Sequence, residues 1–213
     1  MLRNLRQRFS RPAAVLPPQT VVIVSGLPRS GTSMMMKMLE AGGLPVLSDG
    51  QRTADTDNPE GYYEFERVKQ LDKGDNGWLG EAEGKVVKVI SALLEHLPPG
   101  YTYRVIFMNR RLEEVLASQR KMLVHRGQAS DISDEKLAEL LEKHLRKVKG
   151  WLAAQPHFHL IEVDYNRLLA EPQPFAAQIN RFLAGALDEE AMAAVVNPSL
   201  YRNRADGVQS SSA

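Results

Sequence analysis

Residues 20–33 read Thr-Val-Val-Ile-Val-Ser-Gly-Leu-Pro-Arg-Ser-Gly-Thr-Ser, a β-branched run that passes into a loop punctuated by glycine. A short, nearly continuous apolar run of this kind is typical of a buried parallel strand. The methionine-rich residues 34–39 predict a helix after the loop, which ends at Gly42 and Gly43. Because Gly26 and Gly31 allow tight turns that aim successive N–H groups at one point, the stretch predicts a phosphate-binding strand-loop-helix unit.

Strands and helices are predicted to alternate along the rest of the chain. Strands are expected over residues 85–91, 103–109 and 158–163, and helices over about 112–123, 134–152, 175–183 and 188–196. Residues 45–77, rich in Asp, Asn, Gly and Pro, predict a long loop. This alternation predicts an α/β fold, a three-layer sandwich with a mostly parallel central sheet of the P-loop NTPase-like type, which binds ligands at the carboxyl ends of its strands.

Composition narrows the classes of protein to consider. The 213 residues contain 43% hydrophobic residues and carry a net charge of +1, which predicts one globular domain, over 20–205, and no nucleic-acid partner. The absence of cysteine excludes disulfides and thiolate metal sites and favours a cytoplasmic location. Residues 1–19 predict a flexible basic leader, in which Leu2, Leu5 and Phe9 leave membrane contact as a weaker alternative, and residues 206–213 predict a disordered tail.

The loop departs from the pattern of nucleotide hydrolases, G-x-x-x-x-G-K-[ST], in which the Lys contacts the β- and γ-phosphates. Thr32 stands at the position of that Lys, and Arg29 is the cation of the loop. The strand at 103–109 runs into Asn109 and Arg110 rather than a magnesium-binding acid, and Asp164, which follows another strand, comes late in the chain. The sequence therefore lacks the usual groups of ATP chemistry.

Pro28-Arg29-Ser30-Gly31-Thr32 resembles the 5′-phosphosulfate loop, P-[KR]-[SA]-G-T, of the sulfotransferase family. Members of that family transfer a sulfuryl group from 3′-phosphoadenosine 5′-phosphosulfate (PAPS) and need no metal. The resemblance implies that PAPS is the donor and that the loop binds its 5′ end. The loop residues concerned are Pro28, Arg29, Ser30, Gly31, Thr32 and Ser33.

Four further segments are similar to the family, in the same order along the chain. An Arg at the end of a strand and a Ser eight residues later hold the 3′-phosphate in the family, and Arg110 and Ser118 have this spacing. Residues 165–172 are similar to the family segment YEDLLADP, which links a strand to a helix. The late basic stretch 201–204 resembles a basic stretch of the family that can reach the nucleotide, which implies this role for Arg202 or Arg204, with a plain surface arginine as the alternative.

The strand at 85–88 matches the family pattern K-x-x-K, whose second Lys faces the sulfuryl group, so the resemblance implies this role for Lys88. A cation there would stabilise the charge that grows on the leaving phosphate. Together with Arg29, Lys88 is predicted to be catalytic. The alternative interpretation of Lys88 is a lysine at the edge of a strand whose side chain faces water.

The sequence offers several candidates for the catalytic base. Cytosolic members place a histidine two residues after the strand Lys, where this chain has Ile90, and other branches use a Glu from the segment after the loop's helix. The candidates here are Asp55, Asp57, Glu60, Glu64 and Glu66. Glu64 is favoured because Tyr63 and Phe65 flank it and aromatic neighbours can desolvate a carboxylate. Glu60 is second, and a solvated loop without a base stays open.

Two alternative functions stay open. The first is a P-loop kinase-like phosphotransferase, and the second is a sulfotransferase-like module that binds nucleotide without catalysis, which Ile90 at the histidine position favours. The sequence leaves the acceptor, a hydroxyl or an amine, and the oligomeric state undefined.

Overall fold

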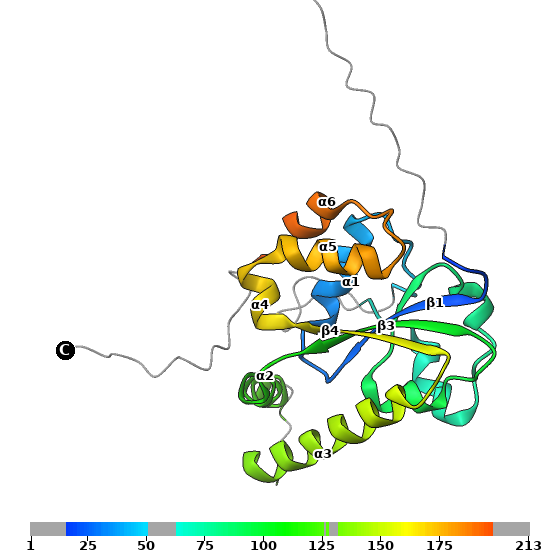
Figure 1. Ribbon diagram of the computed structural model, residues 1–213. Coiled ribbons are helices and arrows are strands. Elements are labelled where there is room, and N and C mark those ends of the chain that lie inside the picture. The colour runs from blue at the N-terminus through cyan, green and yellow to red at the C-terminus, as the bar shows by residue number, and fades with distance from the viewer. Residues whose placement is uncertain (1–15, 51–62, 126, 128–131, 198–213) are drawn as a thin grey trace, which may run out of the picture.

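The computed structural model describes residues 16–50, 63–125, 127 and 132–197 (Figure 1). Within these residues, four strands form one sheet in which each neighbouring pair is parallel, in the order β2-β1-β3-β4. The strands are β1 (Thr20–Gly26), β2 (Val86–Lys88), β3 (Thr102–Asn109) and β4 (Phe158–Asp164). The predicted α/β fold with a parallel central sheet is confirmed.

Helices cover both faces of the sheet and make the predicted three layers (Figure 1). One face carries α1 (Thr32–Ala41), α4 (Tyr165–Ala170), α5 (Pro172–Phe182) and α6 (Glu189–Ala194). The other carries α3 (Asp134–Ala153), with α2 (Leu112–His125) beside it, and the 3₁₀ helices η1 (Glu66–Lys73), η2 (Leu79–Ala82) and η3 (Ser91–His96).

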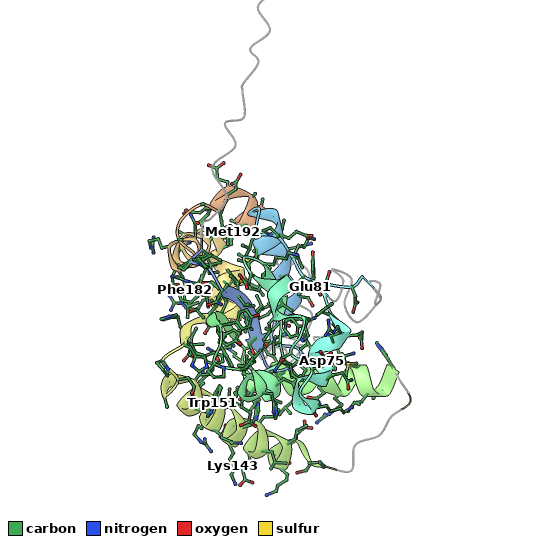
Figure 2. The ribbon with its side chains drawn as sticks, turned by 90° about the vertical axis from the view of Figure 1, so that its right-hand side faces the viewer. Asp75, Glu81, Lys143, Trp151, Phe182 and Met192 are labelled. Atoms are coloured by element: carbon green, nitrogen blue, oxygen red, sulfur yellow. The ribbon has the colours of Figure 1, made fainter. Side chains whose placement is uncertain are left out.

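The alternation of side chains along β1 explains the two cores. Val22 and Val24 contribute to the core beneath α1 and α5, whereas Val21 and Ile23 contribute to the core on the α3 side. Successive strand residues point to opposite faces, and a strand covered on both sides is apolar throughout. Figure 2 shows Met192 of α6 and Trp151 of α3 on opposite sides of the molecule, where each belongs to a different core.

Several elements differ from the sequence prediction, among them α4, which lies in a segment expected to link a strand to a helix. The strand expected over 85–91 is only three residues long, because after Val89 the chain leaves the sheet, and Ile90 is 43% exposed before η3 begins. The long loop expected over 45–77 contains η1, whose buried residues Val68 and Leu71 stand three apart. A spacing of three suits a 3₁₀ helix, which a search for α-helical periodicity overlooks.

The predictions of a flexible leader and a disordered tail fall largely on residues 1–15 and 198–213, outside the described residues. Among the residues that the structure describes, no helix is both long enough and apolar enough to span a membrane.

Candidate active site

The predicted phosphate loop lies between the carboxyl end of β1 and the first turn of α1. Gly26 and Gly31 have φ angles of 147° and 97°, which favour glycine, and Gly31 is the residue that precedes α1. A Cβ atom on Gly26 would lie 2.7 Å from the carbonyl oxygen of Met108 on the adjacent strand β3. The loop can therefore take this path against β3 only with a glycine at position 26.

Ser30 lies inside the loop and is almost completely buried. Its Oγ has no hydrogen-bond partner within the described part of the chain. A buried hydroxyl without a partner is rare in native proteins and commonly indicates a place that a ligand or water completes. This orphaned hydroxyl at a helix N-terminus is consistent with an anion-binding loop.

Arg29 connects this loop to β3 and α2. Its backbone has a φ angle of 72°, the left-handed region that costs a non-glycine residue about 1–3 kcal/mol. Two contacts hold it there: Nη1 of Arg110 donates to the Arg29 carbonyl oxygen at 3.0 Å, and Arg29 Nε donates to Ser118 Oγ at 2.8 Å. Both residues predicted to bind the 3′-phosphate thus contact the loop predicted to bind the 5′ end.

Contacts on several sides fix the guanidinium plane of Arg110, which follows β3. Besides the Arg29 carbonyl, Nε donates to Glu114 Oε2 at 2.9 Å, and the guanidinium carbon lies 4.6 Å from the ring centre of Tyr165. Burial raises the pKa of the Tyr165 hydroxyl, and the charge of Arg110 offsets part of that rise. The Arg110 side chain is 8% exposed.

Glu114 and Asn166 were not identified from the sequence. The Glu114 side chain is fully buried in the first turn of α2, and its second oxygen, Oε1, accepts from Asn166 Nδ2 at 2.9 Å. An Arg–Glu pair four residues apart at a helix start is a signal that could have found Glu114. No local sequence pattern predicts the contact between Glu114 and Asn166, because the two residues are 52 positions apart, on α2 and α4.

Lys88 and Glu64 are both predicted to be catalytic. Since β2 and β3 flank β1, Lys88 lies on the side of the loop opposite Arg110. Lys88 ends β2 and pairs in register with Val24, two residues before the loop begins. Its Nζ lies 4.0 Å from Glu64 Oε1, and Nζ of Lys69 lies 3.5 Å from Glu64 Oε2. The side chains of Lys88 and Glu64 are 10% and 20% exposed, so the pair is shielded but still reaches solvent.

The backbone around Glu64 is tied to the segment after α1. The N–H of Asp49 donates to the Glu64 carbonyl oxygen at 3.1 Å, and the N–H of Glu66 donates to Asp49 Oδ2 at 2.6 Å. The Tyr63 hydroxyl donates to Glu40 Oε2 at 2.7 Å; burial first, and this hydrogen bond second, raise the pKa of Tyr63 above its usual range. These contacts position Glu64 beside Lys88.

Other predicted residues fall elsewhere. The Glu66 side chain is 44% exposed and lies 2.7 Å from Nζ of Lys69, the same ammonium that contacts Glu64 Oε2. Asp164, the acid that could imitate a magnesium ligand, accepts from the N–H of Arg167 at 2.9 Å as the N-cap of α4. The remaining candidates lie outside the described residues: Asp55, Asp57, Glu60 and Arg202.

The close approach of Tyr165 to Gly31 gives a test of the loop. A Cβ atom on Gly31 would lie 2.3 Å from Cδ2 of Tyr165. We expect Gly31→Ala to lower the free energy of unfolding by about 2–4 kcal/mol, because the steric overlap adds to the left-handed backbone cost. Chemical denaturation measures this. Gly43→Ala is the control, since Gly43 has a φ angle of 94° but no atom within 4 Å of an added Cβ; equal losses for the two variants would contradict the packing.

The fold and this site define an α/β protein with a glycine-bounded loop between β1 and the N-terminus of α1. A family model described as "Sulfotransferase domain" matches residues 19–206, which is most of the chain. The chain therefore belongs to the sulfotransferase domain family, and its activity class is that of a sulfotransferase.

Two solved structures share the fold. The sulfotransferase domain of the olefin synthase of Synechococcus PCC 7002 is 15% identical, with a TM-score of 0.50, over 88% of this chain and 84% of that one. Sulfotransferase STF1 of Mycobacterium tuberculosis H37Rv is 17% identical, with a TM-score of 0.53, over 83% of this chain and 70% of that one. Among curated proteins, a search found no matching relative.

Proposed function

We propose that this protein transfers a sulfuryl group from PAPS to a hydroxyl or amine of an acceptor molecule. The observation that carries the proposal is the position of the phosphate loop between two predicted groups. Arg110 and Ser118 contact the loop through Arg29 on one side, and β2 brings Lys88, paired with Glu64, to the end of β1 on the other. PAPS fits this arrangement, because its 3′-phosphate and its reactive 5′-phosphosulfate are separate groups that would bind on different sides of the loop.

The donor would use the two phosphate subsites together. The backbone N–H groups of the loop and the unpartnered Ser30 hydroxyl would receive the 5′-phosphosulfate, with Thr32 and Ser33 half-buried in the first turn of α1. Arg110 and Ser118 would receive the 3′-phosphate, for which a guanidinium is suited because it forms charge-assisted hydrogen bonds.

The transfer itself is an in-line displacement at sulfur. The acceptor oxygen or nitrogen forms a bond to sulfur while the bond from sulfur to the bridging phosphate oxygen breaks. Glu64 takes the acceptor's proton, and Lys88 stabilises the negative charge that develops on the leaving oxygen. The products are the sulfated acceptor and 3′-phosphoadenosine 5′-phosphate (PAP). Arg29 would orient the loop, because both its side chain and its carbonyl are engaged.

The two alternative functions make different demands on the same residues. A phosphotransferase of the P-loop type uses a Lys where this chain has Thr32, and Asp164 already serves as a helix cap. A module that only binds nucleotide needs no carboxylate beside Lys88. The Lys88–Glu64 pair therefore favours an enzyme.

Calorimetric titration tests the proposal. We expect PAP to bind at least about tenfold more tightly than ADP or ATP with magnesium, since each added hydrogen bond to a charged group contributes about 1.5–3 kcal/mol. Preference for ATP with magnesium would favour a phosphotransferase. Tight binding of PAP without release of PAP from PAPS, over a panel of alcohols, phenols and amines, would indicate a binding module.

The 3′-phosphate subsite gives a specific prediction. Arg110→Ala should weaken PAP binding about 10- to 100-fold, because a charged hydrogen-bond donor to the phosphate is lost. Arg111→Ala is the control, since Arg111 is the exposed neighbouring arginine. Calorimetry on both variants measures the difference. A change of less than threefold for Arg110→Ala would remove this residue from the subsite.

Several properties stay predictions. The cytoplasmic location, the absence of a nucleic-acid partner and a reaction without a metal ion follow from composition and from the family resemblance. The acceptor is assigned only as a hydroxyl or amine.

A further inference from the structure

We infer that Glu114 is a positioning residue for recognition of the 3′-phosphate: it holds the Arg110 guanidinium in the orientation that the phosphate requires. This inference rests on the proposed function. Glu114 does not face the donor itself in this role, because its two carboxylate oxygens contact Arg110 and Asn166, each at 2.9 Å.

The guanidinium is constrained from three directions. Glu114 binds Nε, the Arg29 carbonyl accepts from Nη1, and the Tyr165 ring lies under the guanidinium plane. An arginine side chain otherwise loses substantial rotamer entropy when it binds a ligand. Since these contacts already restrict Arg110 before the donor arrives, the cost of ordering it on binding is reduced.

Burial of the carboxylate supports a role in orientation rather than in stability alone. The Glu114 side chain is fully buried and that of Arg110 is 8% exposed. A buried ion pair commonly contributes little net stability compared with apolar residues of similar size, because desolvation opposes the attraction. Its position in the first turn of α2, where the helix dipole favours an anion, lowers that cost further.

Asn166 fixes the carboxylate in turn. Its amide nitrogen donates to Glu114 Oε1, and Asn166 follows Tyr165, the residue that packs against both Gly31 and Arg110. The start of α4 thus supports Arg110 twice, once through the Tyr165 ring and once through Asn166 and Glu114. Glu113, which is exposed in the same turn of α2, provides a matched control of equal charge.

The test compares two nucleotides that differ only in the 3′-phosphate. We expect Glu114→Gln to weaken PAP binding about tenfold, because Arg110 loses its charged partner, and to change 5′-AMP binding less than twofold. Glu113→Gln should leave both affinities unchanged. In the Arg110→Ala background, Glu114→Gln should have no further effect on PAP, because Glu114 acts through Arg110. Calorimetry measures each affinity, with thermal unfolding in parallel.

A second variant keeps the test decisive if Glu114→Gln fails to fold. Asn166→Ala leaves the charge in place and removes one contact of the carboxylate, so we expect a three- to fivefold loss for PAP and none for 5′-AMP. Equal losses for both nucleotides would mean that these residues act on the fold alone, and unchanged PAP binding would also overturn the inference. If the unmodified protein itself binds PAP no better than 5′-AMP, the proposed function fails first, and this inference fails with it.

Discussion

Replacing Glu64 with glutamine is expected to lower kcat for sulfuryl transfer about 10²- to 10⁴-fold, the usual contribution of a general base. Glutamine keeps the shape of the side chain but cannot take the acceptor's proton. The structure pairs the Glu64 carboxylate with Lys88 at 4.0 Å and ties its backbone to Asp49. Because these contacts place Glu64 beside the residue predicted to face the transferring group, its loss should affect turnover rather than donor binding.

The measurement is the release of PAP from PAPS with the acceptor that gives the highest turnover. Glu66→Gln is the matched control, since Glu66 lies in the same segment and also contacts Lys69, but its side chain is 44% exposed against 20% for Glu64. We expect the Kd for PAP to change less than threefold in both variants. A Glu64→Gln enzyme that keeps more than a third of the kcat of the unmodified enzyme would show that Glu64 is not the base. Glu60 would then be the next candidate.

Replacing Lys88 with alanine is expected to lower kcat about 10²- to 10³-fold, the range seen when one donor to a developing negative charge is removed. Lys88 lies at the carboxyl end of β2, in register with Val24 of β1, and its side chain is only 10% exposed. A shielded cation is more effective than one in water, because the surrounding medium screens it less. Its ammonium group would act when the bond from sulfur to the bridging oxygen breaks.

Lys85→Ala is the control for Lys88→Ala, since Lys85 lies three residues earlier, at the other end of the same K-x-x-K pattern. PAP release from PAPS and the Kd for PAP are measured for both variants. We expect a fall in kcat for Lys88→Ala with nearly unchanged binding. Equal falls for the two variants would mean that the strand, and not the Lys88 charge, is responsible.

The strand-loop-helix unit could be predicted from the sequence because its signals are local. The β-branched residues 20–25, the two glycines and the methionine-rich helix follow one another directly, and each has a known backbone preference. The other parallel strands were also expected, and their order around β1 brought Lys88 and Arg110 to the same edge of the sheet. The carboxyl ends of parallel strands form the ligand-binding edge of such folds.

The residues that support the site could not be predicted in the same way. Asn166 and Glu114 are 52 residues apart, and Arg29 and Ser118 are 89 apart, so no local pattern connects them. Residues 165–172 were interpreted only as a link between strand and helix. Tyr165 and Asn166 instead contact the loop and the Arg110–Glu114 pair, because the β3–β4 register places Asp164, the residue before α4, opposite Asn109 at the end of β3.

Arg29 has more contacts than the sequence suggests. As the cation of the loop it was assigned to the 5′ end of the donor, but its Nε donates to Ser118, a residue assigned to the 3′-phosphate. The two proposed phosphate subsites are therefore connected through one residue with a left-handed backbone. Because of this connection, the loop, Arg110 and Ser118 would form one donor site.

The most direct test of a two-phosphate donor site is a crystal structure of the complex with PAP. The prediction is that the 5′-phosphate lies within hydrogen-bonding distance of the N–H groups of Ser30, Gly31 and Thr32, and the 3′-phosphate within hydrogen-bonding distance of Arg110 and Ser118. PAP bound away from the loop, or with its 3′-phosphate pointing to solvent, would contradict it.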